Sequence, residues 1–193
     1  MITETKITIG GFGGQGIVVV GNLIARAALI ENKNVTGMVA YGAEMRGGTA
    51  SATVTVGDEE IASPYVDHPN MAIIMNHPSL ERYEPMITPG GLITLNTSLT
   101  HREPIRTDLT VIKVAATDIA HELGNLRTAN IVILGAFIEQ TKLVKAESIQ
   151  QAITDLFSGK NPKYVPLNLK AFEAGAERSC LIQSPKQSAS AKS

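Results

Sequence analysis

A run of glycines directly after a strand-like pattern is the feature that most constrains this chain. In ITIGGFGGQG, residues 7–16, five of the last seven residues are glycine. Ile7 and Ile9 alternate with polar residues, as in a strand, and apolar residues recur at helical spacing from Val20 to Ala28. A second strand is expected at Asn34–Ala40. Strand, glycine turn, helix and strand together predict a βαβ unit with a right-handed crossover.

The later apolar runs predict further strands and helices. Strands are expected at Thr49–Val56, Asn70–Asn76, Pro89–Asn96 and Leu109–Ala116, and helices at Thr117–Leu123, Thr128–Ile138, Ala146–Phe157 and near Asn168–Arg178. In the first of these strands, small or apolar residues alternate with hydroxyl residues, which predicts one buried face. GDEE, residues 57–60, is expected to turn it into a hairpin with Ile61 and Ala62. The fold class is therefore α/β, a doubly wound mixed sheet, mostly parallel with antiparallel hairpin strands, and helices on both faces.

Length and composition favour one globular domain over residues 1–183. The 193 residues are 44% apolar and 18% charged, enough to bury a sizeable core. The last ten residues, SPKQSASAKS, have almost nothing to bury. We therefore expect residues 184–193 to be a disordered tail.

Charge and composition also argue against several classes of function. The net charge is −1 and no tryptophan is present, which disfavours nucleic acid and anionic membranes as partners. The single cysteine, Cys180, excludes an internal disulfide and the thiolates of an iron–sulfur cluster, and the four histidines show no metal-ligand spacing. No secretory start or run of about 20 apolar residues occurs. A cytoplasmic location, with no metal held by this chain, is the expectation.

The glycine turn fits a nucleotide-binding pattern only in part. Gly11, Gly13 and Gly16 match G-x-G-x-x-G between a strand and a helix, where free N–H groups stabilise a phosphate. The second strand, however, ends at residues 38–41 without the carboxylate that holds a nicotinamide ribose, and no P-loop lysine follows Gly16. The glycines could instead serve helix–sheet packing or the close approach of another chain. A stand-alone NAD(P)- or flavin-dependent oxidoreductase of the Rossmann type, or a regulatory nucleotide-binding module, stays as an alternative.

A second unusual stretch, YGAEMRGG, follows the second predicted strand. It combines Tyr41, Glu44, Arg46 and three glycines within eight residues. It should lie at the carboxyl edge of the sheet beside the glycine turn, where doubly wound sheets bind ligands. Tyr41 and Arg46 could face a charged ligand or a partner, or the stretch could be a solvated surface loop. Nearby, Asn76 is expected to cap the short helix after Pro78.

Together, these two stretches resemble the γ subunit of 2-oxoacid:ferredoxin oxidoreductases. The resemblance extends roughly from Ile7 to Glu139 and includes GNLRTANIVILGAF at residues 124–137. Its G-x-G-G-Q-G turn is matched by Gly11, Gly13, Gly14, Gln15 and Gly16, and its Y-G-x-E-x-R-G-G loop by Tyr41, Gly42, Glu44, Arg46, Gly47 and Gly48. These residues are the candidate cofactor-facing set; no catalytic residue is expected on this chain.

The resemblance implies that the chain is part of a larger enzyme. That family decarboxylates a 2-oxoacid oxidatively with coenzyme A, giving acyl-CoA, carbon dioxide and reduced ferredoxin. Thiamine diphosphate with Mg²⁺ and the iron–sulfur clusters would be carried by α, β and possibly δ subunits, so that the isolated chain would be inactive. The form of the second motif is closer to the 2-oxoglutarate and branched-chain types than to indolepyruvate ones, and among pyruvate, 2-oxoglutarate, branched-chain oxoacids and indolepyruvate we expect 2-oxoglutarate. In isolation, two copies of the chain could form a homodimer in which the alternating strand of one pairs with that of the other across a two-fold axis.

Overall fold

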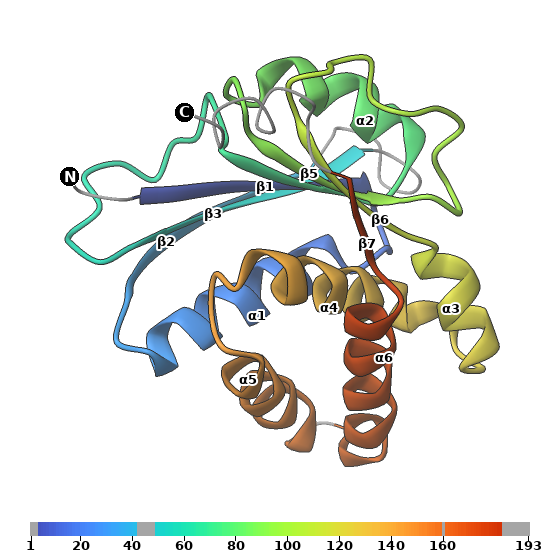
Figure 1. The fold of residues 1–193 in the computed structure, drawn as a ribbon. Coiled ribbons are helices and arrows are strands. Elements are labelled where there is room, and N and C mark those ends of the chain that lie inside the picture. The colour runs from blue at the N-terminus through green and yellow to red at the C-terminus, as the bar shows by residue number, and fades with distance from the viewer. Residues whose placement is uncertain (1–3, 42–48, 160, 183–193) are drawn as a thin grey trace, which may run out of the picture.

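The computed structural model describes residues 4–41, 49–159 and 161–182. Within them a sheet of seven strands has the order β2-β3-β1-β4-β5-β6-β7 (Figure 1). The strands are β1 (Glu4–Phe12), β2 (Asn34–Tyr41), β3 (Thr49–Gly57), β4 (Met71–Ile74), β5 (Leu92–Asn96), β6 (Thr110–Val114) and β7 (Cys180–Ile182). The predicted tail, 184–193, lies outside the described residues.

The sheet has a parallel core with antiparallel strands at both ends. β1, β4, β5 and β6 are parallel neighbours, whereas β3 runs antiparallel between β1 and β2, and β7 runs antiparallel to β6. The βαβ unit predicted from the glycine run therefore has a third strand inserted between its two strands. The predicted α/β mixed sheet is confirmed.

The predicted hairpin of β3 with Ile61 and Ala62 is wrong. Residues 58–70 contain no strand, and β3 pairs along its length with β1 on one side and β2 on the other. From the sequence, two copies of the chain were expected to pair through this strand in a homodimer. That pairing is not available, because both edges of β3 are already paired within the chain. Its alternation is confirmed, since Ala50, Ala52, Val54 and Val56 are all buried.

Helices cover both faces of the sheet. They are α1 (Ile17–Ile30), α2 (His77–Tyr83), α3 (Ala116–Glu122), α4 (Ala129–Thr141), α5 (Ala146–Ser158) and α6 (Val165–Glu177), with short 3-10 turns η1 (Glu84–Met86), η2 (Leu126–Thr128) and η3 (Pro162–Tyr164). In Figure 1, α2 lies on one face, α1 and α4 lie on the other, and α5 and α6 form a further layer beneath them. All the helices expected from the sequence are present within a few residues.

Helix α4 is the centre of the larger core. Every residue from Ala129 to Ile138 is buried, as expected for a helix that is apolar on all sides. It packs closely against α6 because Gly135 and Gly175 bring the two backbones together. A Cβ at Gly135 would collide with the carbonyl oxygen of Phe172, and a Cβ at Gly175 with that of Val132.

We predict that Gly135→Ala and Gly175→Ala each destabilise the chain by about 3 kcal/mol, because a methyl group would force the helix backbones apart. Gly159→Ala is the matched control: Gly159 has right-handed helical angles and open space around its Cβ position, so its stability should stay within about 0.5 kcal/mol or rise. Urea denaturation of the three variants measures the difference. Equal stabilities would contradict the close packing of α4 on α6.

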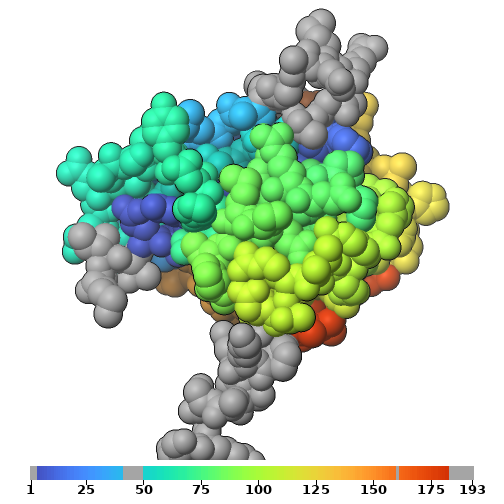
Figure 2. All heavy atoms as spheres, turned by 90° about the horizontal axis from the view of Figure 1, so that it is seen from above, coloured from blue at the N-terminus to red at the C-terminus, as the bar shows by residue number. Residues whose placement is uncertain are grey.

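On the opposite face, α2 and residues 97–108 cover the middle of the sheet (Figure 2). Glu84, 3% exposed, anchors this segment by accepting hydrogen bonds from Arg102 Nη1 at 2.9 Å and from the backbone N–H of Arg106 at 2.7 Å. Arg106 also pairs with Asp108, through Nε–Oδ1 at 3.0 Å and Nη2–Oδ2 at 2.6 Å. The fork of the guanidinium thus fixes the chain before β6.

The Asp108 carboxylate should make stability depend on pH. Its hydrogen bonds from Arg106 and from the Gly90 N–H hold its pKa well below the usual range. Because the pKa is lower in the folded chain than in the unfolded chain, the ionised carboxylate stabilises the fold at pH values above the unfolded-state pKa of about 4. This contribution is lost as the pH falls below that value. Asp108→Asn should therefore lower the free energy of unfolding at pH 7, by an amount that shrinks below about pH 4. Asp67→Asn, which removes one negative charge at an exposed position, is the control in the same urea denaturation. A pH-dependent loss of the same size in this variant would contradict the role of the Arg106–Asp108 pair.

Candidate functional site

The glycine turn, residues 10–16, joins the end of β1 to the start of α1. The backbone N–H of Gln15 donates to the carbonyl oxygen of Phe12 at 3.1 Å. The side chain of Gln15 folds back over the turn, where its Oε1 accepts from the N–H of Phe12 at 2.7 Å and from Asn76 Nδ2 at 3.0 Å. The turn is therefore held in shape by a side chain of its own sequence motif.

The glycines of the turn serve two different purposes. Gly11 and Gly16 allow close packing, because a Cβ at Gly11 would collide with the Ile17 side chain and one at Gly16 with the amide of Asn130. Gly14, with a φ of +95°, has no atom within 4 Å of its Cβ position, and Gly13 and Gly14 are both exposed. The packing role left open from the sequence thus applies to part of the turn, and the rest leaves backbone open to an approaching group.

Amide side chains line the edge where the parallel strands end, which we call the carboxyl edge. Asn76, after β4, accepts from the N–H of Ser79 at 3.0 Å, which confirms it as the cap of α2. Asn96, at the end of β5, donates to Met75 O at 3.1 Å and to Thr117 Oγ1 at 2.9 Å. Asn130, from α4, donates to Gly16 O at 3.2 Å. Asn76 and Asn130 thus bond directly to the glycine turn, and Asn96 links the ends of β4 and β5 to the start of α3.

Two cavities open on either side of the exposed backbone at Gly14. The larger, about 420 Å³, lies between the start of α1 and the ends of α4, α5 and α6. Its lining residues are Gly14, Gly16, Val19, Asn125, Arg127, Thr128, Asn130, Phe157, Asn161, Tyr164 and Asn168. The smaller, about 240 Å³, is lined by Gly14, Gln15, Met75, Leu99, Thr117, Leu126, Arg127 and Ala129. Gly14 and Arg127 belong to both.

The electrostatics of these cavities favour an anion. Among the residues that the structure describes, no carboxylate lines either cavity, and Arg127 is the one charged lining residue in both. The N-terminus of α1 has no side-chain cap and no acidic residue in its first turn, so its N–H groups and the helix dipole are not neutralised. An anionic group near Gly14 would meet the helix terminus and Arg127, with amides and the rings of Phe157 and Tyr164 nearby for an uncharged portion.

The structure brings only part of the sequence-predicted site into view. Gly11, Gly13, Gly14, Gln15 and Gly16 form the glycine turn, and Tyr41 is the last residue of β2. The candidates Gly42, Glu44, Arg46, Gly47 and Gly48 lie outside the described residues. Their flanking residues are placed by register: Tyr41 pairs with Ala50, and Phe12 with Thr49. Tyr41 and Thr49, the described residues on either side of 42–48, therefore lie at the same edge as the glycine turn.

Sequence reasoning did not single out Arg127, Asn130, Asn161 and Asn168 as site residues. Asn130 contacts Gly16 across 114 positions of the chain, and no local pattern reveals such a contact. A partial signal was present, since GNLRTANIVILGAF, which contains Arg127 and Asn130, is one of the stretches that carry the family resemblance. Asn161 and Asn168 lie outside that stretch, and nothing in the sequence indicated them.

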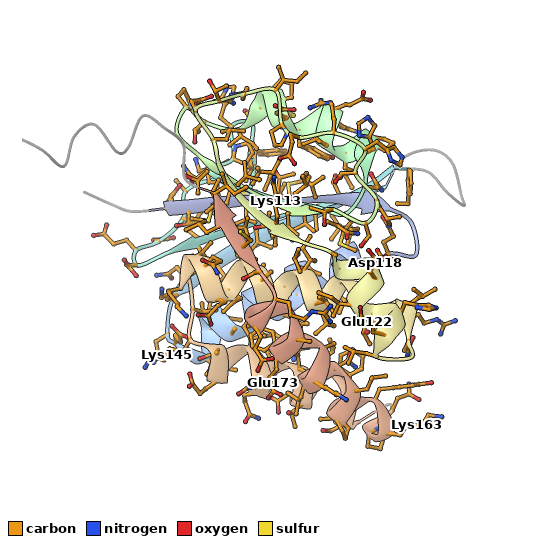
Figure 3. All side chains as sticks on the ribbon, turned by 45° about the vertical axis from the view of Figure 1, so that its right-hand side comes forward. Lys113, Asp118, Glu122, Lys145, Lys163 and Glu173 are labelled. Carbon is orange, nitrogen blue, oxygen red and sulfur yellow. The ribbon has the colours of Figure 1, made fainter. Side chains whose placement is uncertain are left out.

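The groups with clearly shifted pKa values lie away from this edge. Hydrogen bonding and charge from Arg178 lower the pKa of Glu122, through an Nη1–Oε2 contact of 2.6 Å between the end of α6 and α3. Figure 3 shows Glu122 and Asp118 projecting from α3, on the outside of the helical layer.

No cluster of three or more possible metal ligands occurs within residues 4–41, 49–159 and 161–182. Within the same ranges, no helix has the length and hydrophobicity that crossing a bilayer requires.

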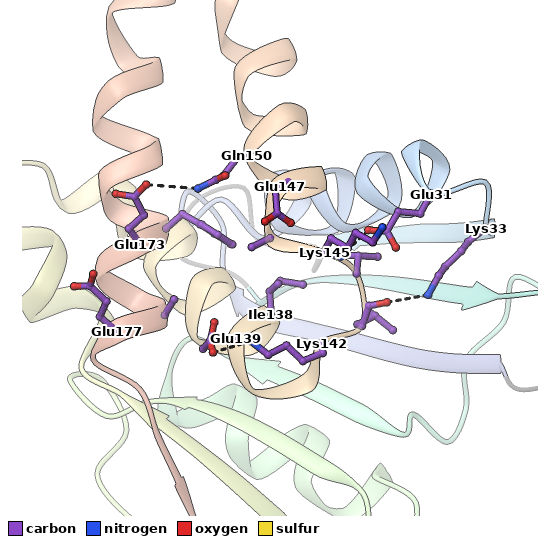
Figure 4. A pocket seen from close by; sticks show the side chains of 15 residues that line it. Glu31, Lys33, Ile138, Glu139, Lys142, Lys145, Glu147, Gln150, Glu173 and Glu177 are labelled. Carbon is purple, nitrogen blue, oxygen red and sulfur yellow. Dashed lines mark hydrogen bonds and ion pairs between the residues drawn. The ribbon is translucent and has the colours of Figure 1, made fainter.

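The largest cavity described, about 620 Å³, is a less suitable candidate site. It lies between the ends of α1 and α4, the start of α5 and the side of α6 (Figure 4). Its charges are of both signs, and Lys142 pairs with Glu139. Lys33 Nζ donates to Leu143 O, and the backbone N–H of Lys145 donates to Glu31. Because it adjoins the C-terminal end of the 14-residue helix α1, it is about 20 Å from the glycine turn.

The fold and the site together define a class: an α/β chain with a glycine turn at the carboxyl edge of a mixed sheet and an amide-lined cleft that contains one arginine. The topology differs from that of a dinucleotide-binding domain, in which the second strand lies directly beside the first. Here β3 separates β2 from β1, so the end of β2 is two strands away from β1. The stand-alone dehydrogenase alternative loses support from this arrangement.

The chain belongs to the pyruvate ferredoxin/flavodoxin oxidoreductase family, which matches residues 6–178. It is 36% identical over 176 residues to the 2-oxoglutarate synthase subunit KorC of Methanocaldococcus jannaschii, covering 89% of this chain and 92% of KorC. It is 37% identical over 175 residues to the ketoisovalerate oxidoreductase subunit VorA of Methanothermobacter marburgensis. There the match covers 90% of this chain but 36% of VorA, so this chain spans about a third of that relative.

Solved structures agree with this assignment. The γ subunit of a keto/oxoacid ferredoxin oxidoreductase from Geobacter sulfurreducens has a TM-score of 0.77 and 26% identity, over 90% of this chain and 97% of that one. A 2-oxoglutarate:ferredoxin oxidoreductase from Magnetococcus marinus, with 2-oxoglutarate, coenzyme A and succinyl-CoA bound, shares the fold with a TM-score of 0.82 and 24% identity. That similarity covers 90% of this chain and 31% of the other. The resemblance to γ subunits seen in the sequence is confirmed.

We predict that alanine is tolerated at Gly14 but not at Gly16. Both have positive φ, which costs a residue with a Cβ about 1–2 kcal/mol, but only at Gly16 would the methyl group also collide with Asn130. Gly16→Ala should therefore cost about 2 kcal/mol more than Gly14→Ala. Urea denaturation measures both, and a larger cost at Gly14 would contradict the described contact between Gly16 and Asn130.

Proposed function

We propose that this chain is the γ subunit of a cytoplasmic complex that oxidatively decarboxylates 2-oxoglutarate with coenzyme A, forming succinyl-CoA, carbon dioxide and reduced ferredoxin. Thiamine diphosphate, Mg²⁺ and the iron–sulfur clusters belong to the α and β subunits and, in complexes that contain one, to a δ subunit. The isolated chain is inactive. Membership of the family supports the activity of the complex as a class, and the choice of oxoacid rests on a narrower observation.

The observation that supports 2-oxoglutarate is the identity to relatives that are matched over most of their length. Identity is nearly equal for KorC and VorA, at 36% and 37%, but the match to VorA covers only part of that protein. The match to the pyruvate/ketoisovalerate common subunit gamma of Thermococcus litoralis covers 98% of that chain, at 31% identity. Among these two nearly full-length matches, KorC is the more similar, and this supports 2-oxoglutarate as the substrate.

The observation that carries the role of this chain is the anion-favouring cleft around Gly14. Arg127 and the α1 N-terminus offer positive charge there, and no carboxylate from the described part of the chain lines either cavity. Such a site binds and orients a charged group but has no base to move a proton. We assign it to the phosphate-bearing end of coenzyme A, at its entrance to the thiamine site formed by the partner subunits. Arg46, in the second motif, is proposed to face the same group or a partner carboxylate.

The guanidinium of Arg127 is exposed, and no ion pair or side-chain hydrogen bond within the described ranges engages it. In the complex purified anaerobically through a tagged copy of this chain, Arg127→Gln should raise the KM for coenzyme A by about tenfold, because one charge-assisted contact is worth roughly 1.4 kcal/mol or more.

Arg46→Ala should lower activity or assembly without unfolding the free chain. Ferredoxin reduction with 2-oxoglutarate, pyruvate and ketoisovalerate as substrates measures both the effect and the preference.

Arg82→Gln is the control for loss of one positive charge. Arg82 is exposed on α2, over the ring of Tyr83 and outside both cavities, so its replacement should leave the KM for coenzyme A unchanged. An unchanged KM in Arg127→Gln, with normal assembly, would refute coenzyme A binding at this cleft. A preference for another oxoacid would refute only the choice of substrate. Recovery of the tagged chain without thiamine-dependent and iron–sulfur partners would refute the subunit role itself.

A further inference from the structure

Strand β2 is a long edge strand without the usual protection. It pairs with β3 through eight consecutive residues and with no bulge, and no strand of the described chain pairs with its outer side. Its sequence, NVTGMVAY, contains no charge and no proline. Natural edge strands normally avoid pairing with other chains by being short, charged, bulged or covered. The opposite edge, β7, has only three residues, so β2 is the edge that is open to another chain.

Helix α1 extends this surface with an apolar stripe. Val18, Asn22, Ala25 and Leu29 follow helical spacing along the side of α1 that is not buried in the core, and Leu29 is 60% exposed. Val18, Asn22 and Ala25 also line a shallow groove of about 190 Å³ beside Gly37, Met38 and Val39 of β2. Met38 and Val39 are 42% and 44% exposed. Strand and helix therefore form one apolar surface, which we call the β2–α1 face.

We propose that the β2–α1 face is a two-fold interface between two copies of this chain. In it, β2 of one copy pairs antiparallel with β2 of the other, so that the sheet continues through both, and the two α1 helices pack side by side. The occupant is a second copy because the face is nearly free of charge: Arg26 is the one charged residue among the exposed positions of α1. The face thus offers no charge complementarity to a charged partner but is complementary to itself.

The register of such a pair follows from symmetry. A two-fold axis perpendicular to the sheet keeps the same face of both copies on the same side. Two residues that lie opposite each other across the axis therefore have their side chains on the same face. An axis through Gly37 pairs Val35 of one copy with Val39 of the other on the helix-covered face, and Thr36 with Met38 on the opposite face. Gly37 meets its own copy at the axis, where the lack of a side chain leaves the groove open.

The same axis suits the helices. Gly37 lies about 10 Å along β2 from Asn34, at roughly 3.3 Å per residue. Helix α1 runs antiparallel to β2, so the same distance is counted back from its last residue. At roughly 1.5 Å per residue, about 10 Å leads from Ile30 to Leu23. The middle of the apolar stripe therefore lies beside Gly37. Two-fold symmetry then places Val18 of one copy near Leu29 of the other, and Asn22 near Ala25.

The size of the face sets the expected strength of the dimer. The eight residues of β2 and six of the unburied residues of α1 make a smaller contact than the roughly 20–30 residues a side of a standard interface. The six are Val18, Asn22, Ala25, Arg26, Leu29 and Ile30. We therefore expect a dissociation constant in the micromolar range. Because the strands pair antiparallel, the two glycine turns lie at opposite ends of the joined sheet, where both stay accessible to other subunits.

Sedimentation equilibrium of the full chain, from about 1 to about 300 μM, tests the proposal. The wild type should dimerise reversibly across this range. Val39→Lys places a lysine on the strand edge and Leu29→Lys places one on the stripe, and each should weaken the dimer at least tenfold. Ile105→Lys, at a side chain that is 75% exposed in the segment over the other sheet face, is the matched control and should leave the dissociation constant unchanged.

Amide hydrogen exchange provides the second measurement, since it reports the strand pairing directly. Alternate amides of β2, those that point away from β3, should exchange more slowly at high concentration of the chain than at low concentration. A monomer at all concentrations would overturn the proposal. A dimer that Val39→Lys does not weaken would also overturn it, provided that circular dichroism shows the variant to be folded. Protection of the β2 amides only in the presence of the other subunits of the complex would overturn it as well.

Discussion

The close approach of α4 and α6 at Gly135 and Gly175 determines where the glycine turn lies. Because α4 is buried on all sides between the sheet and α6, its axis can shift only if the larger core repacks. Its first turn carries Asn130, whose amide meets Gly16 at 3.2 Å, closely enough that no Cβ fits there. The shape of the turn thus depends on a helix contact located elsewhere in the core. A site held by neutral amides on a rigid core can present backbone N–H groups without charged side chains to hold them in place.

The chemistry of the site fits a chain that binds and orients but leaves the reaction to other chains. Both cavities at Gly14 are lined by amides, glycines, apolar side chains and the single charge of Arg127. The shifted carboxyl groups, Asp108 and Glu122, owe their lowered pKa values to structural ion pairs with arginines outside these cavities. A perturbed pKa marks a catalytic group only when it lies in a cleft where substrate binds. In this chain the electrostatics of the cleft and the perturbed carboxyl groups are separate, as expected of a subunit that completes a site formed with its partners.

The sequence predicted the elements well and their neighbours less well. Helical and strand periodicity located α1, α4, α5 and the buried face of β3, because periodicity is a local property of the chain. It could not reveal that β3 lies between β1 and β2, since any two alternating strands satisfy the same pattern; this is also why the hairpin with Ile61 and Ala62 was wrong. β7 was missed because its three residues are all exposed and form no buried pattern. Of the site, the glycine turn was predictable from its motif, whereas Asn168 reaches the cavity only through tertiary packing of α6.

The insertion of β3 links the candidate site to the open edge of the sheet. Because β3 runs antiparallel to both β1 and β2, it must begin where they end, which brings residues 41 and 49 to the carboxyl edge beside Phe12. The same insertion moves β2 outward, so that a strand normally buried beside β1 in a doubly wound sheet becomes the edge. A buried strand is typically uncharged and apolar, and β2 keeps that character at an exposed position. One topological change therefore accounts both for the position of residues 41 and 49 beside the glycine turn and for a surface that favours pairing with another strand.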